Sequence, residues 1–125
     1  MDTCAAQRQL LAEEFGRSRK VFLALGDETR QQILIALLEH EKIGMRVPEI
    51  TAKTHLSRPA VSHHLRILRD AGLIRMHRAG TMNFYYADAD TDCWRSLKVL
   101  VDHVDRVVQS AAASGYPRLR EEEVP

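Results

Sequence analysis

The sequence predicts a mainly helical protein that carries one small β-hairpin. Apolar residues recur at helical spacing over most of the 125 residues, which indicates amphipathic helices. Residues 73–87 instead carry strand-favouring side chains on both sides of Gly80, which predicts a hairpin. The composition, 45% hydrophobic and 28% charged, is that of an ordinary globular domain. We therefore expect a single domain over residues 1–112, followed by a mobile tail over 113–125.

Two helices are expected before residue 41. The first covers about residues 5–25, and Gly16 and Ser18 divide it into two pieces. Asp27 then caps a second helix over about 28–40, because an aspartate at this position can accept a bond from an unpaired amide of the first turn. The expected core face of the second helix consists of Ile33, Leu34, Leu37 and Leu38.

A short third helix is expected after a break in the pattern. Residues 43–47 are too few and contain a glycine, so we expect a turn there with at most a brief strand. Pro48 then opens a helix that ends near Thr54 and buries Ile50. Proline suits the first turn of a helix because its missing N–H has no intrahelical partner there.

The helix over residues 57–72 has two contrasting sides. Ser57 is a good N-cap, Pro59 suits the first turn, and Gly72 supplies the left-handed residue that ends the helix. One side is apolar, and the opposite side carries hydroxyl and guanidinium groups. The apolar residues are Val61, Leu65 and Leu68, and the polar ones are Ser62, Arg66 and Arg69. Joined to the third helix by the turn at Leu56–Ser57, it predicts a helix-turn-helix over 48–71.

The remaining elements are a hairpin and a long last helix. Strands over 73–78 and 82–87 are joined by a turn at 79–81, and this hairpin is a wing beside the helix-turn-helix. The last helix covers about 91–112, and its apolar residues follow a 3-4 rhythm that can build a seam between helices. These residues are Trp94, Leu97, Val101, Val104 and Val108. The predicted fold is therefore a winged helix-turn-helix with an additional C-terminal helix.

The charge distribution indicates where a polyanion would bind. The net charge is only +1, but residues 42–82 carry eight basic and two acidic side chains, whereas the segments on either side are acidic. A basic middle between acidic ends is the pattern expected when only the middle meets phosphate. No apolar run is long enough to span a bilayer, and the first residues lack the features of a signal peptide, so we expect a cytoplasmic protein without a membrane partner.

Several pieces of the sequence resemble the ArsR/SmtB family of bacterial winged-helix repressors. The resemblance covers about residues 20–110, and no single piece is specific on its own. It rests on the residues 22–30 (FLALGDETR), Ile33-Leu34, residues 61–65 (VSHHL), residues 68–74 (LRDAGLI), and Gly80 with Asn83, Tyr85 and Tyr86. The resemblance implies a homodimer with the first and last helices, 1–25 and 91–112, at its interface. It also implies a repressor that binds double-stranded operator DNA and leaves it when an effector binds.

Residue roles follow from the matching positions. The expected DNA contacts, from the reading helix and the wing, are Ser57, Arg58, Pro59, Ser62, His63, Arg66, Arg75 and Arg78. The expected dimer contacts are Leu10, Leu11, Trp94, Leu97, Val101, Val104 and Val108. For Arg30 and His64 we favour structural roles. The alternative is a winged helix that binds other proteins without specific DNA binding. Enzyme activity is not expected, because the sequence has no P-loop, GxSxG or HExxH motif.

The nature of the effector stays open between a small molecule, a thiol-reactive compound and a metal. Some relatives bind metal on the last helix, and the corresponding positions here are Asp90, Asp92, His103 and Arg106. Arginine stays protonated and cannot coordinate a metal, so at most three ligands remain where zinc prefers four. We therefore expect no resident metal or cofactor, with zinc at Asp90, Asp92 and His103 as the alternative.

Thiol sensing would have to use Cys93 and Cys4. Cys93 is expected at the start of the last helix, where the helix dipole lowers a thiol pKa and the nearby aspartates raise it. Cys4 could approach it only if the first and last helices pack suitably. We expect both cysteines to be incidental, with thiol sensing as the alternative.

Overall fold

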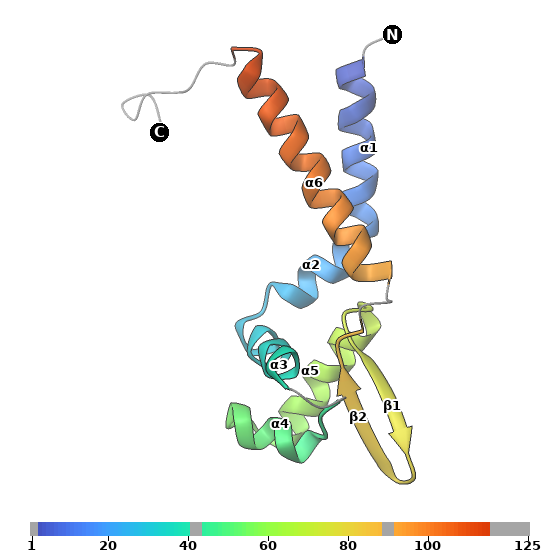
Figure 1. Ribbon diagram of the computed structural model, residues 1–125, viewed down its shortest axis with the longest axis vertical. Helices are drawn as coiled ribbons and strands as arrows, with labels where there is room; N and C mark the ends of the chain where they lie inside the picture. The colour runs from blue at the N-terminus through green and yellow to red at the C-terminus, as the bar shows by residue number, and fades with distance from the viewer. Residues whose placement is uncertain (1–2, 41–43, 89–91, 116–125) are drawn as a thin grey trace, which may run out of the picture.

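The computed structural model describes residues 3–40, 44–88 and 92–115. The mainly helical fold with one hairpin is confirmed, and it belongs to the winged helix-turn-helix class. Figure 1 shows α1 and α6 side by side at one end of the molecule, and α3, α4, α5 and the hairpin at the other. The elements in order are α1 (Thr3–Arg17), α2 (Arg19–Leu25), α3 (Glu28–Glu39), α4 (Val47–Thr54), α5 (Arg58–Asp70), β1 (Arg75–Ala79), β2 (Met82–Tyr86) and α6 (Asp92–Ala113).

The core lies among α2, α3, α4 and α5. Its most deeply buried side chains include Ile33, Ile50, Val61, Leu65, Leu68, Leu73 and Ile74. The predicted core face of α3 is right for three of its four residues, but Leu38 is 62% exposed. Leu38 lies about 100° around the helix from Leu37, which takes it beyond the arc that the neighbouring helices cover. Ala36 is buried on α3 instead.

The predicted helix ends are confirmed by their hydrogen bonds. The Asp27 carboxylate accepts a bond from the Arg30 amide at 2.9 Å, and the Ser57 hydroxyl accepts one from the Ala60 amide at 3.2 Å. Gly72 follows α5 with φ +81°, the left-handed conformation that glycine adopts without strain. These local signals fix where α3 and α5 begin and where α5 ends.

The helix-turn-helix is formed by α4 and α5. Helix α4 begins at Val47, one residue before the predicted start, and Pro48 lies in its first turn. The expected brief strand before it is a single bridge, in which the backbones of Met45 and Tyr85 exchange two bonds of 2.8 Å. His55 adopts the left-handed conformation, with φ 60°, between the two helices. The turn therefore depends on a residue that is not glycine.

Strands β1 and β2 form the antiparallel hairpin. Arg75 pairs with Tyr86 and Ala79 with Met82, so the loop has the two residues Gly80 and Thr81 rather than the predicted three. Strand β1 also begins at Arg75, because Leu73 and Ile74 before it are buried in the core. The hairpin is thus anchored at its base and projects at its tip (Figure 1).

The first turns of α6 pack against the core of their own protomer. Trp94 and Leu97 are half-buried there, and the indole Nε1 of Trp94 donates to the Leu73 oxygen at 3.1 Å. This part of α6 lies over the end of α5, and the place of these two residues at the dimer interface stays a prediction. Farther along α6, Leu100 is 1% exposed, and α6 contacts α1.

Candidate nucleic-acid interface

Helix α5 presents a polar side to solvent along its whole length. Its apolar residues Val61, Leu65 and Leu68 are fully buried, which fixes the rotation of the helix. The opposite side carries the predicted contacts, and all of them are exposed. These are Ser57, Arg58, Pro59, Ser62, His63 and Arg66. Such a helix has the shape and chemistry that the major groove of duplex DNA admits.

Three arginines on α5 have guanidinium groups without partners in the described part of the chain. Arg58, Arg66 and Arg69 make no ion pair or side-chain hydrogen bond with any residue that the structure describes. Arg69 lies one helical turn beyond Arg66 and is exposed, although it was not among the predicted contacts. Unpaired guanidinium groups on one helix face can bind phosphate oxygens or the acceptor edge of guanine.

The arginines of the hairpin already have partners. Arg75 forms an ion pair with Asp88 at 3.4 Å, and the Arg78 Nε donates to the Gly80 oxygen at 3.2 Å. Arg78 lies beside the loop of the projecting hairpin, whereas Arg75 lies at its base. The geometry therefore suits Arg78 to a contact outside the molecule better than Arg75.

A half-buried arginine on α3 ties α5 to the helices behind it. Arg30 donates from Nε to the Ala24 oxygen at 2.8 Å and from Nη2 to the Leu23 oxygen at 3.0 Å, so it caps the end of α2. Its Nη1 lies 3.3 Å from Nδ1 of His64 on α5. The structural roles that we favoured for both residues agree with these contacts.

The electrostatics of this contact favour a neutral imidazole. Burial lowers the pKa of His64, the charges of Arg30 and His63 lower it further, and Asp27 opposes them. A neutral His64 can accept a hydrogen bond at Nδ1 from the Arg30 guanidinium. The pKa of Asp27 is lowered in turn, chiefly by its bond from the Arg30 amide. The His63 ring lies edge-on to His64, with centroids 5.3 Å apart, so this half-buried contact reaches the exposed face of α5.

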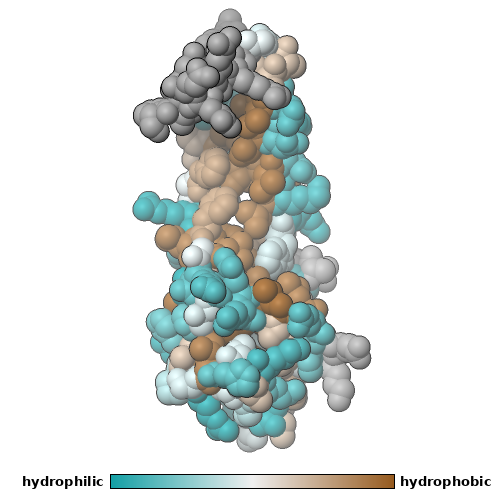
Figure 2. All heavy atoms as spheres, turned by 90° about the vertical axis from the view of Figure 1, so that its left-hand side faces the viewer, coloured by the Kyte–Doolittle hydropathy of each residue, from teal (hydrophilic) through white to brown (hydrophobic). Residues whose placement is uncertain are grey.

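The two terminal helices carry apolar side chains that the protomer leaves uncovered. On α6, Val101 is 55% and Val108 56% exposed, and Val104 between them is half-buried. These three residues, the valine stripe, follow the predicted 3-4 spacing. On α1, Leu10 is 45% exposed and Leu11 is half-buried. Figure 2 shows an apolar band along the terminal helices between hydrophilic side chains.

Comparison with known proteins identifies the family. A family model described as "Bacterial regulatory protein, arsR family" matches residues 27–76, from α3 to the start of β1. An uncharacterized helix-turn-helix transcriptional regulator of Methanocaldococcus jannaschii is 39% identical over 74 residues, which cover 59% of this chain and 81% of that protein. The chain belongs to the ArsR family. It is therefore a DNA-binding transcriptional regulator.

Further ArsR-family proteins agree in sequence and in fold. The transcriptional repressor SmtB homolog of Synechocystis is 36% identical over 83 residues, which cover 66% of this chain and 60% of that protein. An ArsR-like transcriptional regulator from Rhodococcus superposes with a TM-score of 0.69 at 24% identity, over 83% of this chain and 92% of that one. The second likeness shows the fold alone. No helix in the described ranges is long and apolar enough to cross a membrane.

The candidate metal ligands on α6 do not come together within this ArsR-family protomer. Asp90 lies outside the described residues. Asp92 and His103 are eleven residues apart on one helix, a separation of about 16 Å. The Asp92 side chain is 96% exposed, whereas Nδ1 of His103 lies 3.2 Å from both carboxylate oxygens of Glu14 on α1. His103 thus links α6 to α1, and no metal-type cluster occurs among the described side chains.

The environment of Cys93 is less favourable to thiol chemistry than its position suggested. The thiol is half-buried, and its Sγ donates to the Ala71 oxygen at 3.4 Å. Burial raises the pKa of the Cys93 thiol. This effect outweighs the decrease in thiol pKa that a position at the start of a helix can cause. The side chain of Cys4 lies outside the described residues. A thiol with a raised pKa is a poor nucleophile at neutral pH.

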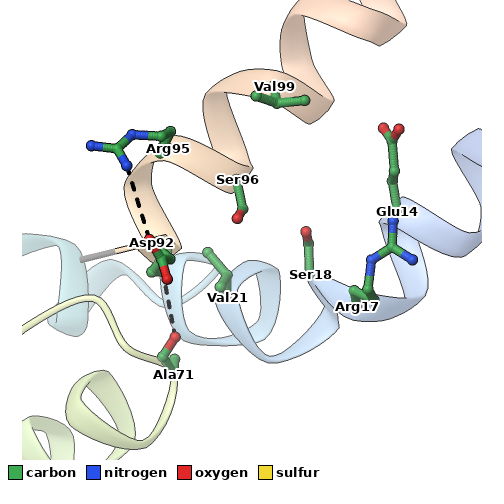
Figure 3. A pocket seen from close by; sticks show the side chains of 10 residues that line it. Glu14, Arg17, Ser18, Val21, Ala71, Asp92, Arg95, Ser96 and Val99 are labelled. Carbon is green, nitrogen blue, oxygen red and sulfur yellow. Dashed lines mark hydrogen bonds and ion pairs between the residues drawn. The ribbon is translucent and has the colours of Figure 1, made fainter. Parts of the chain in front are cut away.

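Sequence reasoning missed a buried serine between α1 and α2. We expected Ser18 only as a break between two helical pieces, but the structure leaves it 8% exposed beside the start of α6. Its hydroxyl caps no helix. No pattern within the sequence could have placed Ser18 next to residues some 75 positions later, since only the packing of α6 on α2 brings them together (Figure 3).

Proposed function

We propose that this ArsR-family regulator is a homodimeric repressor in which each protomer inserts α5 into a major groove and contacts the adjacent backbone with its hairpin. The single observation that carries the proposal is the exposed side of α5, with three guanidinium groups that have no partner among the described residues, over a buried apolar side. A helix of this kind supplies base contacts from its first turns and phosphate contacts from its arginines. We include Ser57, Arg58, Pro59, Ser62, His63, Arg66 and Arg78, and we add Arg69.

The valine stripe supports the dimer. Val101, Val104 and Val108 lie on one side of a helix that already packs against α1, so a second copy would bury them in a four-helix arrangement. Exposed apolar bands of this kind on a soluble regulator commonly mark an interface. A two-fold dimer would also present two copies of α5 to one face of the duplex. Leu10 and Leu11 on α1 remain the proposed contacts on the neighbouring helix.

The alternative of a protein-interaction module has less support. A partner-binding helix is expected to expose large apolar or aromatic side chains. The exposed positions of α5 carry none, since they are Arg58, Pro59, Ser62, His63, Arg66, Arg69 and Asp70. A polyanionic partner fits this surface better than a protein of ordinary composition.

Selection from a random duplex library, followed by anisotropy titration of the enriched sequence, tests the proposal. The logarithm of affinity is expected to fall linearly with the logarithm of salt concentration, by about 0.9 per phosphate contact. Arg66→Ala should weaken binding by about tenfold and reduce that slope by about one if Arg66 contacts phosphate. If Arg66 reads a base, specificity at one position relaxes instead.

Arg8→Ala is the matched control. Arg8 is an exposed arginine on α1, far from α5, so its loss changes the net charge equally and should leave binding within about twofold. No enrichment of any duplex, or equal losses for the Arg66 and Arg8 variants, would refute the proposed interface.

A further inference from the structure

A cavity of about 480 Å³ lies between the corner of α1 and α2 and the first turns of α6. Figure 3 shows Ser18, Val21, Ser96 and Val99 around this space, with Ala71 below it. Its volume falls in the range of about 300–1,000 Å³ that is typical of small-molecule sites. Val21 and Val99 give it apolar walls, and the hydroxyls of Ser18 and Ser96 give it polar ones. The cavity thus combines features that a small organic ligand requires.

The hydroxyl of Ser18 lies at the wall of the cavity. The residue is only 8% exposed, and it lines the cavity. Among the described residues its hydroxyl has no hydrogen-bond partner, although its backbone amide bonds to α1. The hydroxyl oxygen is not one of the fully enclosed atoms of the described residues, so it is accessible from the cavity. A ligand in the cavity can therefore bond to it, since a hydroxyl both donates and accepts.

The charged groups around the cavity indicate which kind of ligand fits. The Glu14 carboxylate is occupied by His103, and Asp92 is paired with Arg95 at 4.0 Å. Arg17, by contrast, has no ion-pair or hydrogen-bond partner in the described ranges. A guanidinium group binds carboxylates through two parallel hydrogen bonds. The free donors are therefore one guanidinium and the serine hydroxyls, which together suit the oxygens of a carboxylate.

The cavity connects the parts of the molecule that an effector must affect. Its walls come from the terminal helices and from Ala71, the residue directly after α5. The Ala71 oxygen accepts the Cys93 thiol bond, and Trp94 bonds to the Leu73 oxygen, so the first turn of α6 is fastened to the end of α5. A ligand that moved α6 relative to α2 would therefore move α5 relative to the dimer helices.

The cavity also remains open in the proposed dimer. Val99 lines it, whereas Val101 belongs to the valine stripe, and residues two positions apart point about 200° apart around a helix. The cavity and the stripe therefore lie on different sides of α6. A second copy on the stripe would not cover the cavity.

We propose that this cavity is an effector site for a small organic acid, whose carboxylate binds Arg17 and Ser18 and whose apolar body packs between Val21 and Val99. This inference rests on the proposed function, since an effector acts on DNA binding. The acid binds more tightly to an arrangement of the protomer in which α5 fits the two half-sites of the operator less well. Binding of the acid therefore shifts the protomer toward that arrangement. The regulator then leaves its operator.

Binding is measured first without DNA, by titrating acetate, hexanoate and benzoate into the labelled 125-residue chain and following backbone amide signals by NMR. Hexanoate and benzoate should shift the signals of Val21, Ser96 and Val99, and acetate should shift them less because it has almost no apolar body. Hexanol and benzyl alcohol, which lack the carboxylate, should bind more weakly. If none of the acids shifts these signals, or if the alcohols bind equally well, the proposal is wrong.

Variants separate a ligand contact from a structural role. Ser18→Ala should weaken binding of the acids by about tenfold, yet leave the unliganded protein as stable as the wild type, because the hydroxyl is accessible from the cavity and has no partner to lose among the described residues. Arg17→Gln should weaken binding of the acids to a similar extent. The matched controls are Ser110→Ala and Arg8→Gln, which change exposed residues outside the cavity. Equal binding by Ser18→Ala and Ser110→Ala would overturn the assignment.

The effect on DNA is measured separately, so that the two proposals can fail independently. Hexanoate or benzoate in excess should release wild-type protein from the selected duplex, and Ser18→Ala should resist release. If the protein selects no duplex at all, the proposed function fails, while the NMR titration still reports on the cavity. If the acids bind in the cavity but leave DNA affinity unchanged, the effector role is refuted.

Discussion

Nη1 of Arg30 lies 3.3 Å from Nδ1 of His64, and this contact joins the end of α2 to helix α5. The two residues are 34 positions apart in the sequence. Arg30 is oriented by the carbonyl oxygens of Leu23 and Ala24 and by its own amide bond to Asp27, so its guanidinium group has little freedom. The contact therefore supports the rotation of α5 that its buried apolar residues set.

This contact predicts a pH dependence of stability. The pKa of His64 in the folded protein is lowered from the usual 6.5, chiefly by burial. As the pH falls through 6.5, the unfolded chain takes up a proton that the folded protein does not, so the free energy of unfolding decreases. The contribution of His64 to the free energy of unfolding is fully present above pH 6.5. It is lost as the pH falls through the lowered pKa that His64 has in the folded protein. Urea unfolding at pH 7.5 and at pH 5.5 measures the loss.

His64→Asn should reduce this loss, because asparagine offers an oxygen acceptor near the Nδ1 position and does not titrate. His63→Asn is the control, since it removes the exposed neighbouring imidazole and keeps the Arg30–His64 contact. The interpretation would be contradicted if His64→Asn lost as much stability between the two pH values as the wild type does.

The cap of α5 gives a second prediction, in which Ser57 and Ser62 differ in what their hydroxyls contribute to stability. Ser57→Ala removes the hydroxyl that accepts the Ala60 amide, so it should lower the free energy of unfolding by about 1 kcal/mol. Ser62→Ala removes an exposed hydroxyl without a partner in the described ranges, so unfolding should change by less than about 0.5 kcal/mol. Urea titration compares the two, and equal losses would argue against the cap.

The sequence predicted best what depends on neighbours along the chain. Helix α5 was recognised from Ser57, Pro59 and Gly72 because a cap, a first-turn proline and a left-handed glycine act within a few residues. The rhythm of α6 was also recognised, but it did not show which of its residues contact the core of their own protomer. A spacing of three and four shows that a helix has an apolar side, and it cannot show that Trp94 and Leu97 meet the core while Val101 and Val108 meet solvent.

The features that the sequence did not predict depend on contacts between segments that are far apart along the chain. The Arg30–His64 contact, the His103–Glu14 contact and the cavity beside Ser18 each join elements that only the folded arrangement brings together. Residues of this kind have no local signature, because their partners are chosen by how helices pack and not by spacing. Ser18 in particular reads as a helix break in the sequence and becomes a buried residue beside a cavity in the structure.

The valine stripe gives a third prediction, on the oligomeric state. Val101→Asp places a charge on the proposed interface and should shift the protein from dimer to monomer at micromolar concentration, as sedimentation equilibrium would show. Val99→Asp is the matched control, because Val99 is 53% exposed, close to the 55% of Val101, but lies on a different side of α6. Dissociation of both variants, or of neither, would place the interface elsewhere.

The turn between α4 and α5 gives the last prediction, in which one substitution by glycine stabilises and another destabilises. His55 holds φ 60°, a conformation that costs a residue with a Cβ about 1–2 kcal/mol. Glycine adopts it freely but makes the unfolded chain more flexible, at a cost of about 0.5–1 kcal/mol. His55→Gly should therefore raise the free energy of unfolding by up to about 1 kcal/mol.

His40→Gly is the matched control, since His40 follows α3 with an ordinary extended backbone, φ −75° and ψ 124°. Glycine relieves no backbone strain at this position. It only makes the unfolded chain more flexible, so the free energy of unfolding should fall by about 0.5–1 kcal/mol. Thermal and urea unfolding of both variants give the signs directly. A loss of stability in His55→Gly would mean that the imidazole of His55 makes contacts in the turn worth more than the strain that it carries.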